Sequence, residues 1–164
     1  MMLKKQIKNY DEAIVYAKKY IEQSKIINGK YSNLNFQSYA SLVKLYAIKT
    51  DSIQTFKALD CMEGSIVSSL LDKGMLAAYY NLRASCCVIF KNYDEALELL
   101  EKSNTLLKDR SIEDTPSKYK YFEYKSEILY KQQRYDESYD IYQECVQACK
   151  NKYGENSCLL YTSD

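Results

Sequence analysis

Apolar residues recur at helical spacing along almost the whole chain, and polar or glycine-containing breaks separate the apolar stretches. Side chains three and four positions apart share one face of an α-helix, so this spacing predicts amphipathic helices. The breaks are Asn28-Gly29, Glu63-Gly64-Ser65, Lys73-Gly74 and Thr115-Pro116-Ser117. Helices are therefore expected over residues 8–27, 34–49, 52–70, 75–90, 93–108, 116–132 and 135–151.

A short motif repeats along the chain. Tyrosine, aspartate, glutamate and a small residue follow one another at Tyr10–Ala13, Tyr93–Ala96 and Tyr135–Ser138. The small residues of the last two copies are 42 positions apart, and those of the first two are 83 apart, which is two periods. That period predicts a degenerate copy near residue 55, and Thr55 fits its small position.

Each copy of the motif is expected to open a helix. Asn or Asp stands where an N-cap is wanted, and the Asp-Glu pair falls in the first turn, where the helix dipole favours negative charge. Thr115 before Pro116 has the pattern of an N-cap followed by the first helical residue. Because the Asp-Glu pairs recur with the repeat, capping explains them better than acid–base catalysis does.

The helices are expected to pair as antiparallel hairpins over residues 34–70, 75–108 and 116–151. The first helix, 8–27, has no preceding helix A. Four apolar residues in or just before it would therefore be left exposed: Ile7, Ile14, Tyr16 and Ile21.

The order of large and small residues resembles the tetratricopeptide repeat (TPR) family. In that family a bulky, a small and a bulky residue recur in helix A, and a tyrosine, an acidic residue and a small residue open helix B. Two copies fit well: Tyr80, Ala84, Cys87, Tyr93, Ala96, Leu100 and Ser103, and then Phe122, Ser126, Leu129, Tyr135, Ser138, Tyr142 and Cys145. A poorer copy has valine in the small position: Tyr39, Val43, Tyr46, Thr55, Leu59 and Met62.

The resemblance covers nearly the whole chain and implies an all-α fold. Residues 1–157 would form a right-handed α-α superhelix, a TPR-like solenoid, in which small residues mark close approaches between helices. The period of about 42 is longer than the family's usual 34. The resemblance is specific for the fold and says little about the partner.

Composition narrows the function. One proline and four glycines among 164 residues agree with long helices and short connections. The chain has 23 basic and 22 acidic residues with no basic patch, so no nucleic-acid partner is expected. No apolar run approaches the roughly 18 residues of a membrane span, and no signal peptide is predicted.

Candidate chemistry is sparse. The chain has no histidine, which excludes histidine-dependent nucleophilic catalysis and imidazole metal ligands. The six cysteines lack a Cys-x-x-Cys spacing, and Cys87 and Cys145 fall at buried repeat positions. No glycine-rich phosphate loop is present. We therefore predict no catalytic, metal or cofactor site, no enzymatic activity and, from the unpaired cysteines, a cytoplasmic setting.

The last residues form an unusual segment. Residues 158–164 are what the string tgt-ctc-tta-tac-aca-tct-gac encodes, and that string looks like a transposon-end adapter of sequencing libraries. These residues are therefore expected to be a non-native tail, and the chain a fragment of a longer solenoid. In the alternative interpretation, Leu159–Tyr161 begin the next helix A.

The helix-A residues between the packing positions would line the concave face of a solenoid. The predicted partner-binding residues are Gln37, Lys44, Asn81, Ser85, Lys120, Glu123 and Glu127. In the alternative interpretation they form a solvated face without a ligand. The predicted function is a protein–protein interaction module that binds a peptide or helix of an unidentified partner. The alternative is a sensory or regulatory repeat region of a larger bacterial histidine kinase or transcription regulator.

Overall fold

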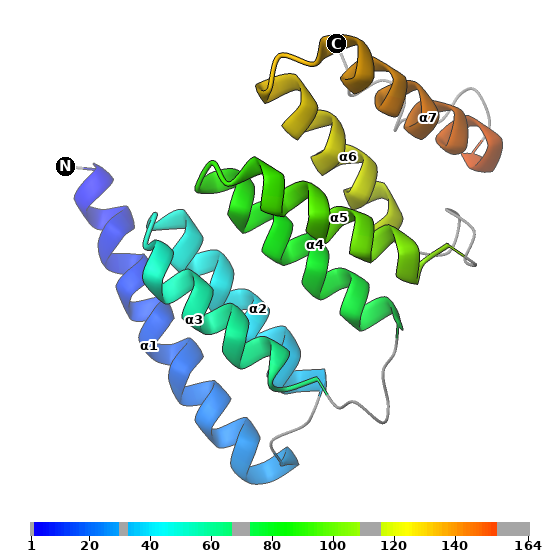
Figure 1. Cartoon of the computed structure of the whole chain (residues 1–164). Coiled ribbons are helices and arrows are strands. Elements are labelled where there is room, and N and C mark those ends of the chain that lie inside the picture. Colours follow the sequence, from blue (N-terminus) through cyan, green and yellow to red (C-terminus); the bar gives the residue numbers. More distant parts are fainter. Residues whose placement is uncertain (1, 30–32, 67–72, 109–115, 154–164) are drawn as a thin grey trace. The chain divides into compact units, whose positions relative to one another are not determined.

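The computed structural model describes residues 2–29, 33–66, 73–108 and 116–153, and all secondary structure within those ranges is helical (Figure 1). The helices of the described ranges are α1 (Met2–Asn28), α2 (Asn33–Ile48), α3 (Ser52–Glu63), α4 (Lys73–Ile89), α5 (Tyr93–Leu106), α6 (Pro116–Lys131) and α7 (Tyr135–Tyr153). These seven helices and the lack of strands in the same ranges confirm the predicted all-α class. The chain divides into two compact units, residues 1–72 and residues 73–164. Residues 158–164, the predicted tail, lie outside the described ranges.

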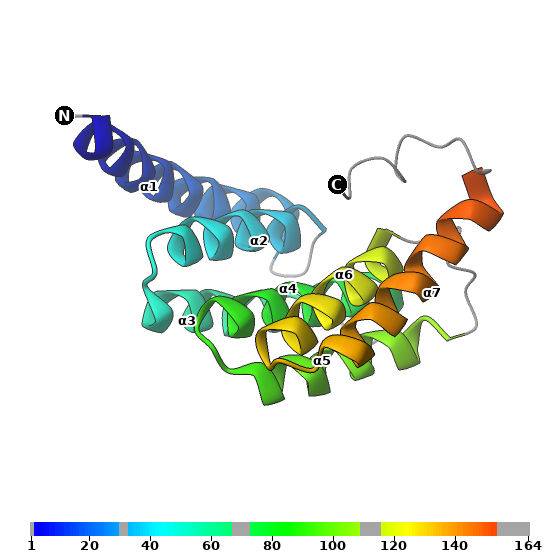
Figure 2. The same cartoon turned by 90° about the horizontal axis from the view of Figure 1, so that it is seen from above.

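In the first unit, α2 lies between α1 and α3 and packs against both (Figure 2). Its core contains Val43 of α2 and the repeat residues Thr55 and Leu59 of α3. Ile14 and Ile21 of α1 are buried as well. The expectation that the missing preceding helix leaves them exposed is therefore wrong for these two, because the following helix α2 packs against α1, whereas Tyr16 is 70% exposed, as expected. The side chain of Ile7 lies outside the described residues.

In the second unit, α4 and α5 form a hairpin, α6 packs against both of them, and α7 packs against α6. The predicted small positions lie where helices approach closely. Ser103 Oγ of α5 donates a hydrogen bond to the carbonyl oxygen of Ala77 in α4 at 3.2 Å. Ser138 Oγ of α7 donates to the carbonyl oxygen of Ser126 in α6 at 2.8 Å. A larger side chain at either serine would force the helix pair apart.

The helices α2, α4 and α6 each end in a turn of the same type. Each ends beside a non-glycine residue of positive φ: Thr50 (55°), Lys91 (63°) and Gln133 (62°). At the first turn, the Thr50 N–H bonds to the Ala47 carbonyl (2.9 Å) and the Asp51 N–H to the Tyr46 carbonyl (3.1 Å). This pair of bonds is a Schellman motif, and it recurs after α4 and α6. The turns are 41 and 42 residues apart, which confirms the predicted period for these hairpins.

The helix starts agree with the sequence in part. Asp51 caps α3 by accepting a hydrogen bond from the Gln54 N–H at 3.0 Å. Asn92 is the N-cap residue of α5 without a side-chain cap bond, and its amide instead donates to Glu95 at 2.5 Å. Pro116 begins α6, while Thr115 lies outside the described residues.

Two predicted boundaries are wrong. The prediction of a helix start at the Tyr10 motif fails because α1 already begins at Met2, and Asp11 inside it pairs with Lys49 beyond α2. The predicted helix 52–70 ends at Glu63, because Gly64 and Ser65 form a turn there. The Gly64 N–H bonds to the Asp60 carbonyl, and Ser65 Oγ donates to the Met62 carbonyl at 2.6 Å. This local hydroxyl bond competes with helix continuation.

Among the described helices, none combines the length and the apolar composition that crossing a membrane requires.

Candidate functional site

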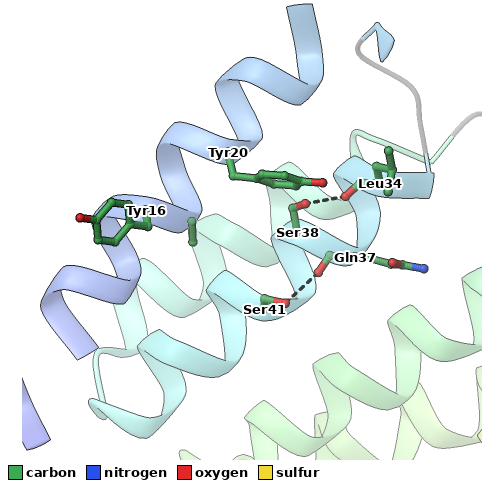
Figure 3. A pocket seen from close by; sticks show the side chains of 7 residues that line it. Tyr16, Tyr20, Leu34, Gln37, Ser38 and Ser41 are labelled. Carbon is green, nitrogen blue, oxygen red and sulfur yellow. Dashed lines mark hydrogen bonds between the residues drawn. The ribbon is translucent and has the colours of Figure 1, made fainter. Parts of the chain in front are cut away.

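A groove of about 450 Å³ runs between α1 and α2 in the first unit (Figure 3). Tyr20 extends from α1 toward Ser38 of α2, and Tyr16 lies one turn earlier on α1. Both rings are largely exposed, Tyr16 at 70% and Tyr20 at 52%. The groove is lined by Tyr16, Ala17, Tyr20, Leu34, Gln37, Ser38 and Ser41. It therefore presents tyrosine rings to solvent beside small side chains of the facing helix.

The two flanks of α1 differ, and this difference leaves the groove open. On one flank, Lys25 Nζ lies 5.4 Å from the centre of the Tyr39 ring and Lys18 Nζ lies 5.8 Å from that of Tyr46. A hydrogen bond with Tyr39 raises the pKa of Lys25 above its ordinary value. On the other flank, the side chains on α2 opposite Tyr16 and Tyr20 are the short Ser38 and Ser41.

The hydroxyls of the groove bond to their own helix. Ser38 Oγ donates to the Leu34 carbonyl at 2.6 Å, and Ser41 Oγ donates to the Gln37 carbonyl at 3.1 Å. The Gln37 side chain extends away from the tyrosines at the rim of the groove (Figure 3). The Tyr20 hydroxyl, which reaches over Ser38, is thus the group best placed to hydrogen-bond to a ligand in the groove, and the Gln37 amide is available at its rim (Figure 3).

Two of the predicted partner-binding residues lie on this unit. Gln37 lines the groove and is exposed. Lys44 is exposed on the same stripe of α2, seven positions further on and past the lining residues. The sequence missed Tyr20 and Leu34 as groove residues because tyrosine and leucine at helical spacing resemble core residues.

The other five predicted residues lie in the second unit, and the prediction that all are exposed is wrong for Asn81. This side chain is only 4% exposed. Ser85, one turn later on α4, is half-buried; its hydroxyl donates to the Leu82 carbonyl at 2.8 Å and interacts with Tyr124 of α6. The packing of α6 against α4 explains why this stripe of α4 is covered.

Lys120, Glu123 and Glu127 are exposed on α6, as predicted. Each forms an ion pair on its own helix: Lys120 with Glu123 at 2.5 Å, and Glu127 with Lys131 at 3.4 Å. Exposed pairs of this kind contribute about 0–1 kcal/mol each, so a charged partner could replace either of them at low cost.

A second groove, with a larger volume of about 730 Å³, lies between α4 and α5 and includes Tyr80, Leu97 and Glu101. None of the predicted partner-binding residues lines it. Its Glu101 already accepts hydrogen bonds from Tyr121 at 3.1 Å and Lys125 at 2.6 Å. The α1–α2 groove is therefore the better candidate site.

Cys86 and Cys87 are buried free thiols that are poorly suited to nucleophilic chemistry. Burial raises the pKa of Cys86 to about 11 and that of Cys87 to about 12. Both thiols thus stay protonated near neutral pH, as expected for the core. Cys145, predicted to be buried, is only half-buried because no described helix other than α6 covers α7. Within the described ranges, no cluster of three His, Cys, Asp or Glu side chains could hold a metal ion.

No protein-family model and no curated protein sequence matches this chain. Among solved structures, the crystal structure of BtubC (BKLC) from P. vanneervenii is similar, with a TM-score of 0.68 and 16% sequence identity. The similarity covers 96% of this chain and 61% of BtubC, so the chain spans about three fifths of that protein's length. At this identity the likeness concerns the fold alone, and BtubC is likewise helical.

Proposed function

We propose that this chain is a protein–protein interaction module with TPR-like helical hairpins, and that the α1–α2 groove binds a peptide or helix of its partner. The repeated turns at Thr50, Lys91 and Gln133 support the repeat architecture. The observation that carries the binding proposal is the exposure of Tyr16 and Tyr20 on one wall of a groove.

The groove suits an apolar side chain carried on a peptide. Tyrosine is enriched at protein interfaces because it buries a large rigid ring while its hydroxyl keeps a hydrogen bond. An apolar side chain entering beside Ser38 would cover the ring of Tyr20 and displace water from it. The Gln37 amide at the rim could then bond to the peptide backbone.

A peptide-display selection on the full chain tests this proposal without knowledge of the partner. Selected peptides are expected to bind Tyr20→Glu at least about tenfold more weakly than the unchanged protein, because the variant places a charge in the apolar wall. Ile26→Glu is the matched control, since Ile26 is exposed on the same helix outside the groove. Peptides that bind Tyr20→Glu as well as Ile26→Glu, or no enriched peptides, would reject the groove as the binding site.

A further inference from the structure

The hairpins α4–α5 and α6–α7 occupy equivalent places in successive repeats but differ in what covers them. The α6 helix packs against both helices of the α4–α5 hairpin. Among the described helices, α7 packs against α6 alone. The 42-residue offset that relates Ala96 to Ser138 therefore permits a comparison position by position.

Positions that are buried in the first of these hairpins are exposed in the second. Leu100 is 0% exposed and its equivalent Tyr142 is 39% exposed. Val88 is 8% exposed and its equivalent Tyr130 is 63% exposed. Asn81 is buried and its equivalent Glu123 is exposed. The exposed set defines an α6–α7 face: Glu123, Glu127 and Tyr130 of α6 with Tyr135, Tyr139 and Tyr142 of α7.

The α6 helix shows the chemistry of a helix that covers such a face. Its apolar residues Phe122 and Leu129 are buried in the core. Beside them it aims hydrogen-bond donors at carboxylates of α5. Lys125 and Tyr121 both donate to Glu101, and Gln132 Nε2 lies 3.5 Å from Asp94 Oδ1. A helix that covers such a face thus combines an apolar stripe with hydrogen-bond donors that meet the carboxylates of the covered hairpin.

The α6–α7 face carries carboxylates at two positions where the face that α6 covers is neutral. Glu123 and Glu127 stand where α4 has Asn81 and Ser85, and each also forms an exposed pair with a lysine of α6. On α7, Asp136 flanks the tyrosine stripe and forms no ion pair with any described residue. A second copy of the same face would bring these carboxylates against each other, whereas lysine or arginine side chains would complement them.

We propose that the α6–α7 face binds a basic amphipathic helix of a partner protein. The apolar stripe of that helix covers Tyr130, Tyr139 and Tyr142, and its lysine or arginine side chains lie against the flanking carboxylates. The tyrosine faces add cation–π attraction for the same side chains. This surface lies in the second unit and does not share residues with the α1–α2 groove, so the two surfaces can be tested separately.

The test uses a peptide of residues 116–134, the α6 sequence, as a defined basic amphipathic helix. It contains five basic residues, and a hydrocarbon staple replacing Glu123 and Glu127 removes its two acidic residues and favours the helix. Titration calorimetry with the full chain should give saturable binding that weakens as salt is added. Tyr139→Asp and Tyr142→Asp should bind at least about tenfold more weakly.

Matched variants distinguish binding at this face from binding at the α1–α2 groove and from a loss of folding. Tyr142→Leu restores the residue that α5 has at the equivalent position, and should bind within about threefold of the unchanged chain. Tyr20→Glu, in the α1–α2 groove, should bind normally. Circular dichroism checks the fold of each variant; if Tyr142→Asp loses helix, Tyr139→Asp decides, since Tyr139 is 62% exposed.

Four results would overturn the proposal. The peptide could fail to bind, or Tyr139→Asp could leave its affinity unchanged. Sedimentation could also show a dimer of the unchanged chain that Tyr139→Asp converts to a monomer, which would mean that the face pairs with a second copy. Loss of binding in Tyr20→Glu alone would mean that the peptide binds in the α1–α2 groove and not on the α6–α7 face.

Discussion

Three residues hold a left-handed backbone conformation without being glycine: Thr50, Lys91 and Gln133. A side chain with a Cβ costs about 1–2 kcal/mol in this conformation, and β-branched residues fit it worst. The Schellman hydrogen bonds of each turn hold the conformation despite that cost. No glycine marks these three positions in the sequence. The connections between paired helices are therefore predicted from the motif that follows each turn, and not from the turn residues.

Thr50→Gly should stabilise the protein by about 0.5–1 kcal/mol, because glycine adopts a φ of 55° without steric cost. Part of the gain is offset by the larger backbone entropy of glycine in the unfolded chain. Urea unfolding followed by circular dichroism measures the change. Thr50→Ala keeps a Cβ and should gain less. A glycine variant no more stable than the alanine variant would show that the turn is not strained at this residue.

At the level of helices, the small residue near the start of α5 controls how closely α5 approaches its neighbours. Ala96 is fully buried, and α5 packs against both α4 and α6. Its repeat equivalent Ala13 is only half-buried, on α1, which among the described helices packs against α2 alone. The same residue type at the same repeat position therefore has different surroundings.

Ala96→Leu should destabilise the protein by about 1–3 kcal/mol, because added methylene groups in a packed core force the helices apart. Ala13→Leu is the matched control and should cost clearly less, since its added side chain can turn toward solvent. Melting temperatures of the two variants, followed by circular dichroism, measure the difference. Equal losses of stability would mean that the repeat position, and not the neighbouring helix, sets the cost.

For the whole molecule, helix positions were predictable because they depend on local spacing, breakers and caps. Which face of each helix is buried by a neighbouring helix was less predictable. Gln37 and Asn81 are both polar residues between packing positions, yet Gln37 is exposed and Asn81 is buried. That outcome depends on where α6 packs, which is a long-range contact that spacing does not encode. Tyr20 of the groove likewise has the same residue type and spacing as a core tyrosine.

Contacts between neighbouring helices also govern how the molecule should open. In repeat proteins, stability is the sum of each repeat and its nearest-neighbour interfaces, so local damage stays local. Leu59 and Leu100 occupy equivalent positions, are both fully buried, and belong to different compact units. Replacing either by alanine should cost about 2–5 kcal/mol. The two variants therefore destabilise the two units by comparable amounts.

Native-state hydrogen exchange would show which helices are destabilised in each variant. In Leu100→Ala we expect faster exchange through α4, α5, α6 and α7 with little change in α1, α2 and α3, and in Leu59→Ala the reverse. The reason is that each unit has its own core, so opening one unit does not require the other to unfold. If either variant accelerated exchange uniformly across all of these helices, the chain would be a single cooperative unit, and its two binding surfaces could not be varied independently.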